Sequence, residues 1–190
     1  MRTKDENKKE AIFSATIKVI NEIGFANVSM SKIAKTAGVS ASTLYIYYKN
    51  KEDLFRKVYV EVKKHMLLAC NKGLSEKEST ETNVRRMCEN ILAFAQKHRE
   101  YFLFLEQSSN SPLITSELFE EVAHLTEKTN IIFQKGINEG TLKDAPPFLL
   151  VGFCVYPIAQ IYKDSYNNDG LLKNTNYDLV FQMCWDAVKK

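Results

Sequence analysis

The sequence predicts an all-helical fold. Glycine and proline are scarce, with 7 and 4 among 190 residues. No segment alternates apolar and polar residues over the length of a strand with turn dipeptides at its ends. Apolar residues instead recur every three or four positions, which is the spacing of one face of a helix. Because 45% of the residues are hydrophobic, the chain can bury a core, and the composition argues against disorder.

The first helix is expected to end at Gly24, since glycine suits the residue that follows a helix C-terminus. One apolar stripe at helical spacing precedes this glycine. Its members are Ile12, Ala15, Thr16, Val19, Ile20 and Ile23.

Two short helices are expected next, from Ser31 to Ala37 and from the N-cap Ser40 to Tyr47, with Gly38 between them. Ala34 is small enough to let the two helices pack closely, and Gly38 can take the positive φ of the turn. The apolar residues that would fill the space between the helices are Ile33, Ala37, Val39 and Leu44. This is the helix-turn-helix pattern, whose second helix can enter the major groove of DNA.

A long helix is expected to begin at Asn50, because Asn50 with Asp53 resembles a capping box. The polar segment 73–83 follows and is the best linker candidate. Five more helices are expected, over residues 82–97, 99–108, 114–139, 146–165 and 174–189. The chain would then hold about nine helices. They divide into a three-helix domain over 1–50 and a larger helical domain over 51–190, connected by the helix that starts at 51.

The charge is distributed unevenly along the chain. Residues 1–64 carry 13 basic and 7 acidic residues, a net charge of +6, whereas residues 65–190 carry 13 and 16, a net charge of −3. A basic N-terminal third and a mildly acidic remainder indicate that any nucleic-acid surface lies in the first third.

The stretch 33–54, IAKTAGVSASTLYIYYKNKEDL, resembles the signature of the TetR family of bacterial transcription regulators. The shared features are an IA pair, an AGVS turn, a TLY recognition helix, an aromatic pair and a K-x-K-E-x-L entry into the fourth helix, and the match covers residues 8–56. Ser42 and Tyr48 depart from it, because the family often has a small or basic residue at the first position and phenylalanine at the second. The resemblance implies a dimeric DNA-binding regulator whose larger domain binds a small molecule.

Residues around the second short helix are expected to contact DNA. Tyr47 lies on the outward side, where a phenol can hydrogen-bond a phosphate, and the resemblance also places a phosphate contact there. Lys51 lies in the first turn of a helix, where the helix dipole disfavours a cation, so an external anion would account for it. Lys49 fits a phosphate contact and a solvated charge equally, and Tyr45 and Tyr48 fit helix packing as well as DNA contact, with the core favoured for Tyr48. The expected set is Ser31, Lys32, Ser40, Ala41, Ser42, Thr43, Tyr45, Tyr47, Lys49 and Lys51.

The last two predicted helices suit a dimer interface. Segment 146–165 is apolar almost all round, and the last helix has a broad apolar face, so both must be buried on several sides. The family pairs such helices with their symmetry mates, and the alternative is a core within one chain. The expected interface residues are Phe148, Val151, Val155, Ile158, Tyr177, Phe181 and Trp185.

An effector pocket is expected near the aromatic segment 101–107 and the helix before it. An aromatic-lined cavity with a few polar groups suits an apolar or aromatic ligand that carries one polar or cationic group, although an ordinary core with polar edges has the same pattern. The expected lining residues are Met66, Asn90, Phe94, His98, Tyr101, Phe104, Glu106 and Gln107.

Other function classes find no support in the sequence. The cysteines and histidines lack metal-ligand spacing, so the four cysteines are interpreted as buried free thiols, and no catalytic or cofactor motif occurs. The longest apolar run, 148–159, is too short to cross a bilayer, and the charged start is unlike a signal peptide.

We therefore expect a cytoplasmic protein that is not an enzyme and needs no cofactor or metal. It would be a repressor released from a palindromic operator by a small molecule. The alternative is a small-molecule-binding adaptor that no longer reads an operator, against which the intact set Ser42, Thr43, Tyr47 and Lys51 argues.

Overall fold

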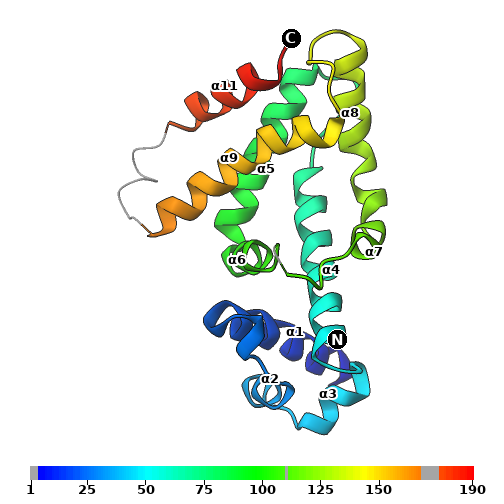
Figure 1. The fold of residues 1–190 in the computed structure, drawn as a ribbon, viewed down its shortest axis with the longest axis vertical. Helices are drawn as coiled ribbons and strands as arrows, with labels where there is room; N and C mark the ends of the chain where they lie inside the picture. The colour runs from blue at the N-terminus through cyan, green and yellow to red at the C-terminus, as the bar shows by residue number, and fades with distance from the viewer. Residues whose placement is uncertain (1–3, 110, 168–175) are drawn as a thin grey trace. The chain divides into compact units, whose positions relative to one another are not determined.

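The computed structural model describes residues 4–109, 111–167 and 176–190. These residues form ten α-helices and two 3-10 helices, and they contain no β-strand (Figure 1). The predicted all-helical fold, with an N-terminal helix-turn-helix followed by a larger helical part, is confirmed. The tenth α-helix arises where one predicted helix is interrupted. None of the helices in the described ranges is both long and apolar enough to span a membrane.

The chain forms two compact units. The N-terminal unit comprises Met1–Lys64 and His98–Val122, and the C-terminal unit comprises His65–Lys97 and Ala123–Lys190. Helix α4 (Lys51–Cys70) supplies residues to both units. The division of the sequence at residue 50 stays a prediction.

Three helices of the N-terminal unit enclose its core. Helix α1 (Lys4–Ile23) packs against α2 (Met30–Ala37), which packs against α3 (Ala41–Tyr47). Five of the six members of the apolar stripe predicted for α1 are buried, and Ile23 at the end of the helix is half-buried. The buried five are Ile12, Ala15, Thr16, Val19 and Ile20. Apolar periodicity alone therefore identified the buried face of this helix.

Helix α6 (Arg99–Ser108) also packs against α1, which places a late segment of the chain in the N-terminal unit. The Asn21 side-chain amide donates to the Glu100 carbonyl at 2.9 Å, and the Gln107 amide donates to the Asn21 carbonyl at 3.3 Å. The Phe13 and Tyr101 rings meet edge to face at 5.7 Å between centroids. These contacts join α6 to the last turns and the middle of α1.

The C-terminal unit is built from α5 (Thr80–Lys97), α8 (Glu127–Asn138), α9 (Pro147–Asn167) and α11 (Tyr177–Val188). Helix α9 packs against the other three (Figure 1). The core of this unit is apolar. Cys70, Cys88, Cys154 and Cys184 are buried thiols outside any disulfide, as predicted. The predicted last helix, 174–189, begins at Tyr177, and positions 174 and 175 lie outside the described residues.

The helix predicted over 114–139 is wrong as one element. The structure divides it into α7 (Ser116–Glu120), the 3-10 helix η2 (Ala123–Leu125) and α8. The Thr126 backbone N–H and hydroxyl both donate to the Ala123 carbonyl, and the Asn71 side-chain amide donates to the Leu125 carbonyl. The Leu125 carbonyl, which would accept a backbone hydrogen bond in a continuous helix, thus accepts one from the distant Asn71 side chain. The sequence around the break contains no glycine or proline that would signal it.

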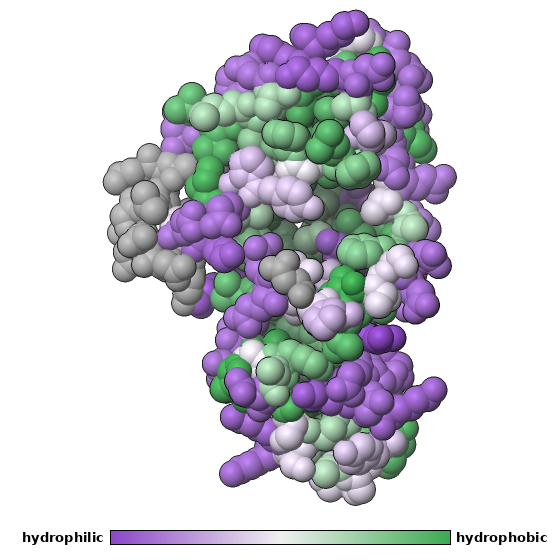
Figure 2. Space-filling view, in the orientation of Figure 1, coloured by the Kyte–Doolittle hydropathy of each residue, from purple (hydrophilic) through white to green (hydrophobic). Residues whose placement is uncertain are grey.

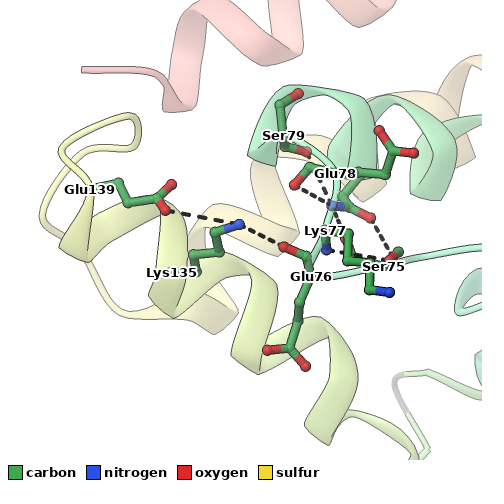
Figure 3. A network of polar contacts seen from close by, with 8 residues as sticks. Ser75, Glu76, Lys77, Glu78, Ser79, Lys135 and Glu139 are labelled. Carbon is green, nitrogen blue, oxygen red and sulfur yellow. Dashed lines mark hydrogen bonds and ion pairs between the residues drawn. The ribbon is translucent and has the colours of Figure 1, made fainter.

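The polar segment 73–83 is not a linker between domains but an ordered turn within the C-terminal unit (Figure 3). Asn83 is buried, and its side chain accepts from the Ser75 backbone N–H and donates to the Ser75 carbonyl, both at 2.8 Å. Lys135 of α8 donates to the Glu76 carbonyl at 2.7 Å. The buried Asn83 amide therefore holds this segment in a defined turn, whereas the polar composition of the segment suggested a linker.

Candidate DNA-binding interface

The turn between α2 and α3 has the geometry that the sequence predicted. Gly38 adopts φ 68° and ψ 30°, the left-handed conformation that favours glycine, and its N–H donates to the last carbonyls of α2. The next residue, Val39, donates to the Ala34 carbonyl at 3.0 Å, and Ala34 is buried. Leu44 of α3 is fully buried. The crossing of the two helices is therefore fixed by a positive φ, a small residue and one buried leucine.

Hydroxyl groups gather at the start of α3. The Ser40 hydroxyl oxygen accepts from the Thr43 backbone N–H at 3.2 Å, which makes Ser40 the N-cap as predicted. The same oxygen lies 2.8 Å from the hydroxyls of both Ser42 and Thr43. Short polar side chains of this kind can donate to or accept from base edges and phosphates.

The solvent-facing side of α3 also carries an apolar residue that the sequence analysis missed. Ser42, Tyr45 and Ile46 are exposed and lie three and four positions apart, so they share one face of the helix. Ile46 is 75% exposed and Tyr45 is 58% exposed. The position of Ile46 one helical turn after Ser42 and outside the Leu44 face was the signal that could have identified it.

Tyr47 is part of a charged cluster with the first helix. Its hydroxyl donates to Asp5 Oδ1, Asp5 forms an ion pair with Lys9 at 3.3 Å, and Lys9 Nζ lies 5.3 Å from the centroid of the Tyr47 ring. The hydrogen bond from Tyr47 holds the pKa of the Asp5 carboxyl below its usual value and raises the pKa of the phenol. No local pattern in the sequence connects Asp5 and Lys9 with this site.

The structure gives Lys51 partners inside the chain. Lys51 Nζ lies 4.4 Å from the centroid of the Phe25 ring and donates to the Phe25 carbonyl at 3.4 Å. A carbonyl and a ring face stabilise this cation at the start of α4, so an external anion is not needed to explain it. Tyr48, predicted to be in the core, is half-buried beneath Lys57, whose Nζ lies 5.3 Å from the ring centroid.

The capping box predicted at Asn50 forms in a modified way. Asn50 Oδ1 accepts from the Asp53 backbone N–H at 2.8 Å, as a cap does. The Asp53 carboxylate, however, accepts from the backbone N–H of Lys49 at 2.9 Å, one residue before the expected donor.

Most of the predicted DNA-binding residues reach solvent. Those classed as exposed are Ser31, Lys32, Ser40, Ser42, Tyr45 and Lys49, and those half-buried are Ala41, Thr43, Tyr47 and Lys51. Ser31 and Lys32 lie in the first turn of α2, which begins after the N-cap Ser29. The chain thus presents a continuous set of small polar, aromatic and basic side chains from its helix-turn-helix.

The predicted effector residues fall into both units. Met66, Asn90 and Phe94 belong to the C-terminal unit, and His98, Tyr101, Phe104, Glu106 and Gln107 belong to the N-terminal unit. Two of the polar groups serve the fold: the Asn90 amide donates to the carbonyls of Cys70 and Lys72, and Gln107 is bonded to α1 as described. Phe94 and Phe104 are buried, and His98 stacks on Tyr101 at 5.7 Å. The cavities described below contain none of these eight residues.

Among the described residues of the C-terminal unit, side chains line a groove and a smaller cavity. One is an open groove of about 710 Å³ between η2, α8 and the start of α9. The other is a small cavity of about 70 Å³ enclosed by α5, α9 and α11. Within the described residues, no group of three or more His, Cys, Asp or Glu side chains is placed to hold a metal ion.

The predicted interface residues are divided between the inside and the outside of the chain. Ile158, Phe181 and Trp185 are each at most 5% exposed and belong to the core of the C-terminal unit, so they have almost no surface left for a partner. Val151, Val155 and Tyr177 are half-buried, whereas Phe148 is 77% exposed. The exposed large apolar residues of α9 and α11 overlap with the predicted set only at Phe148, and they are Phe148, Leu149, Phe153, Tyr156, Leu179 and Met183.

A helix-turn-helix with a solvent-facing second helix, joined to a larger helical unit, defines a DNA-binding regulator. Residues 12–58 match the family described as bacterial regulatory proteins, tetR family, and residues 80–189 match the tetracyclin repressor-like C-terminal domain. The chain belongs to the TetR family. It is accordingly a transcriptional regulator with a helix-turn-helix DNA-binding domain, and the prediction that it is not an enzyme is confirmed by this membership.

Individual known proteins resemble most or all of the chain. A fatty acid metabolism regulator protein of Bacillus subtilis is 30% identical over 181 residues, which cover 89% of this chain and 86% of the relative. An uncharacterized HTH-type transcriptional regulator of Haemophilus influenzae is 25% identical over 190 residues and all of both chains. The crystal structure of a TetR family transcription regulator from Marinobacter aquaeolei superposes with a TM-score of 0.85, at 29% identity, over all of both chains.

Proposed function

We propose that this regulator is a repressor that binds a palindromic operator as a homodimer and is released by a small-molecule effector in the cytoplasm. The observation that carries the DNA-binding part is the outward face of α3, where the exposed Ser42 and Ile46 lie on either side of the buried Leu44 in the sequence and follow a capped N-terminus. N-terminal residues of a recognition helix contact base edges in the major groove.

The side chains divide by chemistry into two roles. Ser42 and Thr43 can exchange hydrogen bonds with base edges, and Ile46 can only make apolar contact, for which the thymine methyl group is the partner in the major groove. Lys49 and Tyr47 carry a positive charge and a phenolic O–H, and both suit phosphate oxygens. Phosphate contacts set affinity and salt dependence, whereas base contacts set sequence preference.

The exposed apolar stripe of α9 and α11 supports the homodimer. Leu149, Phe153 and Tyr156 repeat every three or four positions on α9, and Leu179 and Met183 do so on α11. Figure 2 shows apolar residues gathered on the face that α9 crosses. Large apolar surfaces of this kind mark interaction sites, and a four-helix interface with a second copy would cover both helices.

Gly152 adds a place for close approach to this proposed interface. It lies within α9 between Leu149 and Phe153 and is half-buried, with the movable Tyr156 ring 3.1 Å from where its Cβ would be. Without a side chain, it lets a second helix come near the α9 backbone. We therefore propose that the two copies of α9 cross near Gly152.

The release step rests on α4, which begins beside α3 at Lys51 and ends in the C-terminal core at Cys70. A ligand that shifts residues near Met66 would act on the same helix that follows the recognition helix. Coupling of this kind is typically about 1 to 3 kcal/mol, or about 5-fold to 150-fold in affinity, and it is reciprocal. Operator DNA should then weaken ligand binding by the factor by which the ligand weakens operator binding.

Selection of bound duplexes from random DNA tests the proposal. The purified protein should enrich a near-palindrome whose half-sites are about 34 to 36 Å apart, and it should sediment as a dimer. Release by small-molecule fractions of a cell extract then tests the effector. A protein that enriches no sequence would instead be a helical adaptor.

A further inference from the structure

A carboxylate lies among the groups that face DNA in the proposed function. The Tyr47 hydroxyl donates to Asp5, and the Lys9 ammonium group is 3.3 Å from the same carboxylate. Lys9 also lies over the Tyr47 ring, with Nζ 5.3 Å from its centroid. One anion is therefore held by a phenolic O–H and an ammonium group from α3 and α1.

This donor pair has the chemistry of a phosphate site. A phosphodiester oxygen and a carboxylate oxygen are both anionic acceptors, and lysine and tyrosine are among the side chains that bind DNA phosphates. A phenol has a single proton to donate, and an ionised carboxylate can only accept. Tyr47 can therefore donate to Asp5 or to a phosphate, but not to both at once.

We propose that Tyr47 and Lys9 form a binding site for a DNA phosphate, and that Asp5 occupies this site as an internal substitute that the phosphate displaces. The inference rests on the proposed DNA-binding role of α3. Lys9 then becomes a DNA contact that the helix-turn-helix motif alone does not include. Asp5 then lowers operator affinity because it competes with the phosphate for the same two donors.

The exposure of the cluster permits this exchange. The side chains of Lys9 and Asp5 are 55% and 56% exposed, so a phosphate can reach both partners. Ion pairs this exposed are weak and can be replaced without unfolding the helix. The hydrogen bond from Tyr47 and the neighbouring Lys9 lower the pKa of Asp5, so the competing group is a carboxylate at neutral pH, as an ordinary aspartate also is.

A double-mutant cycle on the selected operator tests the competition. Asp5→Asn should raise operator affinity about 5-fold per subunit, the worth of one hydrogen bond, because its amide competes weakly with phosphate. Tyr47→Phe should weaken binding by about 2-fold in the native background, where the lost phosphate bond is offset by the lost Asp5 bond. In the Asp5→Asn background the same change should cost about 5-fold.

The salt dependence tests the lysine. Lys9→Gln should make the slope of log K against log salt shallower by about 0.9 for each subunit. Lys18→Gln is the matched control, because Lys18 is exposed on the same helix and lies about 13.5 Å further along its axis. Glu22→Gln, at the exposed far end of α1, is the matched control for Asp5→Asn. Lys18→Gln should leave the salt slope unchanged, and Glu22→Gln should leave the effect of Tyr47→Phe on operator affinity unchanged.

Three results would overturn the inference: additive effects of Asp5→Asn and Tyr47→Phe, equal gains from Asp5→Asn and Glu22→Gln, or an unchanged salt slope for Lys9→Gln. Thermal melts of each variant show that its fold is intact. If the unmodified protein binds a selected operator and the cycle is additive, only this inference fails. If the unmodified protein selects no DNA, the proposed function fails with it.

Discussion

The two units of this chain use apolar side chains in opposite ways. In the N-terminal unit, the recognition helix α3 buries a single leucine, Leu44, and its direction is set by local devices: the Ser40 cap and the positive φ of Gly38. In the C-terminal unit, α9 and α11 are apolar on more than one side, so one face fills the core and another reaches solvent. Local signals define a DNA-facing helix, whereas only the packed structure tells which face of an apolar helix is inside.

The largest expected effect separates the inside from the outside of α11. Phe181→Ala and Trp185→Ala should each destabilise the chain by about 3 to 5 kcal/mol, because both aromatics lie in the core and their loss leaves cavities. Urea unfolding measures this loss.

The matched pair for that test is Leu179→Ala with Met183→Ala, two exposed residues at the same four-residue spacing on the same helix. This pair should leave the helical content intact and lower the mass observed in sedimentation from dimer to monomer. If Phe181→Ala and Trp185→Ala dissociate a dimer without destabilising the chain, the assignment of the two faces is reversed.

High pH should destabilise the C-terminal unit, which contains all four cysteines. Burial raises the pKa of the Cys154 thiol from 9.0 to about 12, and burial also raises the pKa of Cys88. Above pH 9 the unfolded chain loses a thiol proton that the folded chain keeps, so the free energy of unfolding should fall between about pH 9 and 12. The slope is about 1.4 kcal/mol per pH unit for each such thiol, and the stabilisation is fully present below pH 9.

Unfolding of Cys154→Ala as a function of pH measures that contribution. The variant should be less stable at pH 7 because of the lost volume, but its stability should fall less steeply above pH 9. Parallel curves for the variant and the native chain would show that Cys154 does not titrate differently on folding.

The predictability of the fold follows the same division. Spacing and caps in the sequence identified α1, α2 and α3 and the Gly38 turn, because each signal lies within a few residues of its effect. The break before α8 depends on Asn71, which lies more than fifty residues away from the Leu125 carbonyl that it bonds. No local pattern in the sequence reveals this contact. The same is true of Asn83, whose hydrogen bonds to Ser75 order the polar segment 73–83.

The candidate site shows a similar limit. The sequence identified Ser42 and Tyr47 from their positions in the motif, but the partners of Tyr47 come from the start of α1, 42 residues earlier for Asp5. The sequence pointed to an external anion for Lys51 because its neighbour Phe25 lies 26 residues earlier. The fold decides which charged residues lie close together, so the partners of these side chains could not be predicted from the sequence.

Substitutions of two glycines should have smaller effects. They compare a turn that is set by local backbone conformation with a helix that is set by packing. Gly38→Ala should cost about 1 to 2 kcal/mol, since an alanine at φ 68° is strained even though no atom lies within 4 Å of its Cβ. Gly152→Ala should leave the chain equally or more stable, because alanine favours the α9 helix and its Cβ meets only a movable Tyr156 ring at 3.1 Å.

Thermal unfolding of both variants and sedimentation of the second are the measurements. Gly152→Ala should weaken association if the two α9 helices approach closely there, while operator affinity per dimer stays unchanged. A stable, fully dimeric Gly152→Ala protein would place the crossing elsewhere on α9.

The smallest expected effect concerns the one exposed aliphatic side chain of the recognition helix. Ile46 has no donor or acceptor, so it cannot bind a phosphate, and its 75% exposure shows that the chain itself does not cover it. Ile46 lies four residues after Ser42, about 6 Å along the helix axis, which corresponds to about two base pairs at about 3.4 Å each. We expect a thymine within two base pairs of the base that Ser42 contacts, with its methyl group against Ile46.

Replacing each thymine of the selected operator by uracil, one at a time, removes single methyl groups without altering hydrogen bonds. One such change per half-site should weaken binding to the native protein by about 0.8 kcal/mol, the worth of one buried methylene-sized group, or about 4-fold. The same change should have no effect on Ile46→Ala, because the contact is then already lost, whereas Ser42→Ala should keep the full methyl effect and change the preferred base at its own position. Equal sensitivity to uracil in the native protein and in Ile46→Ala would mean that the DNA-facing unit, unlike the core of its neighbour, derives nothing from its exposed apolar side chain.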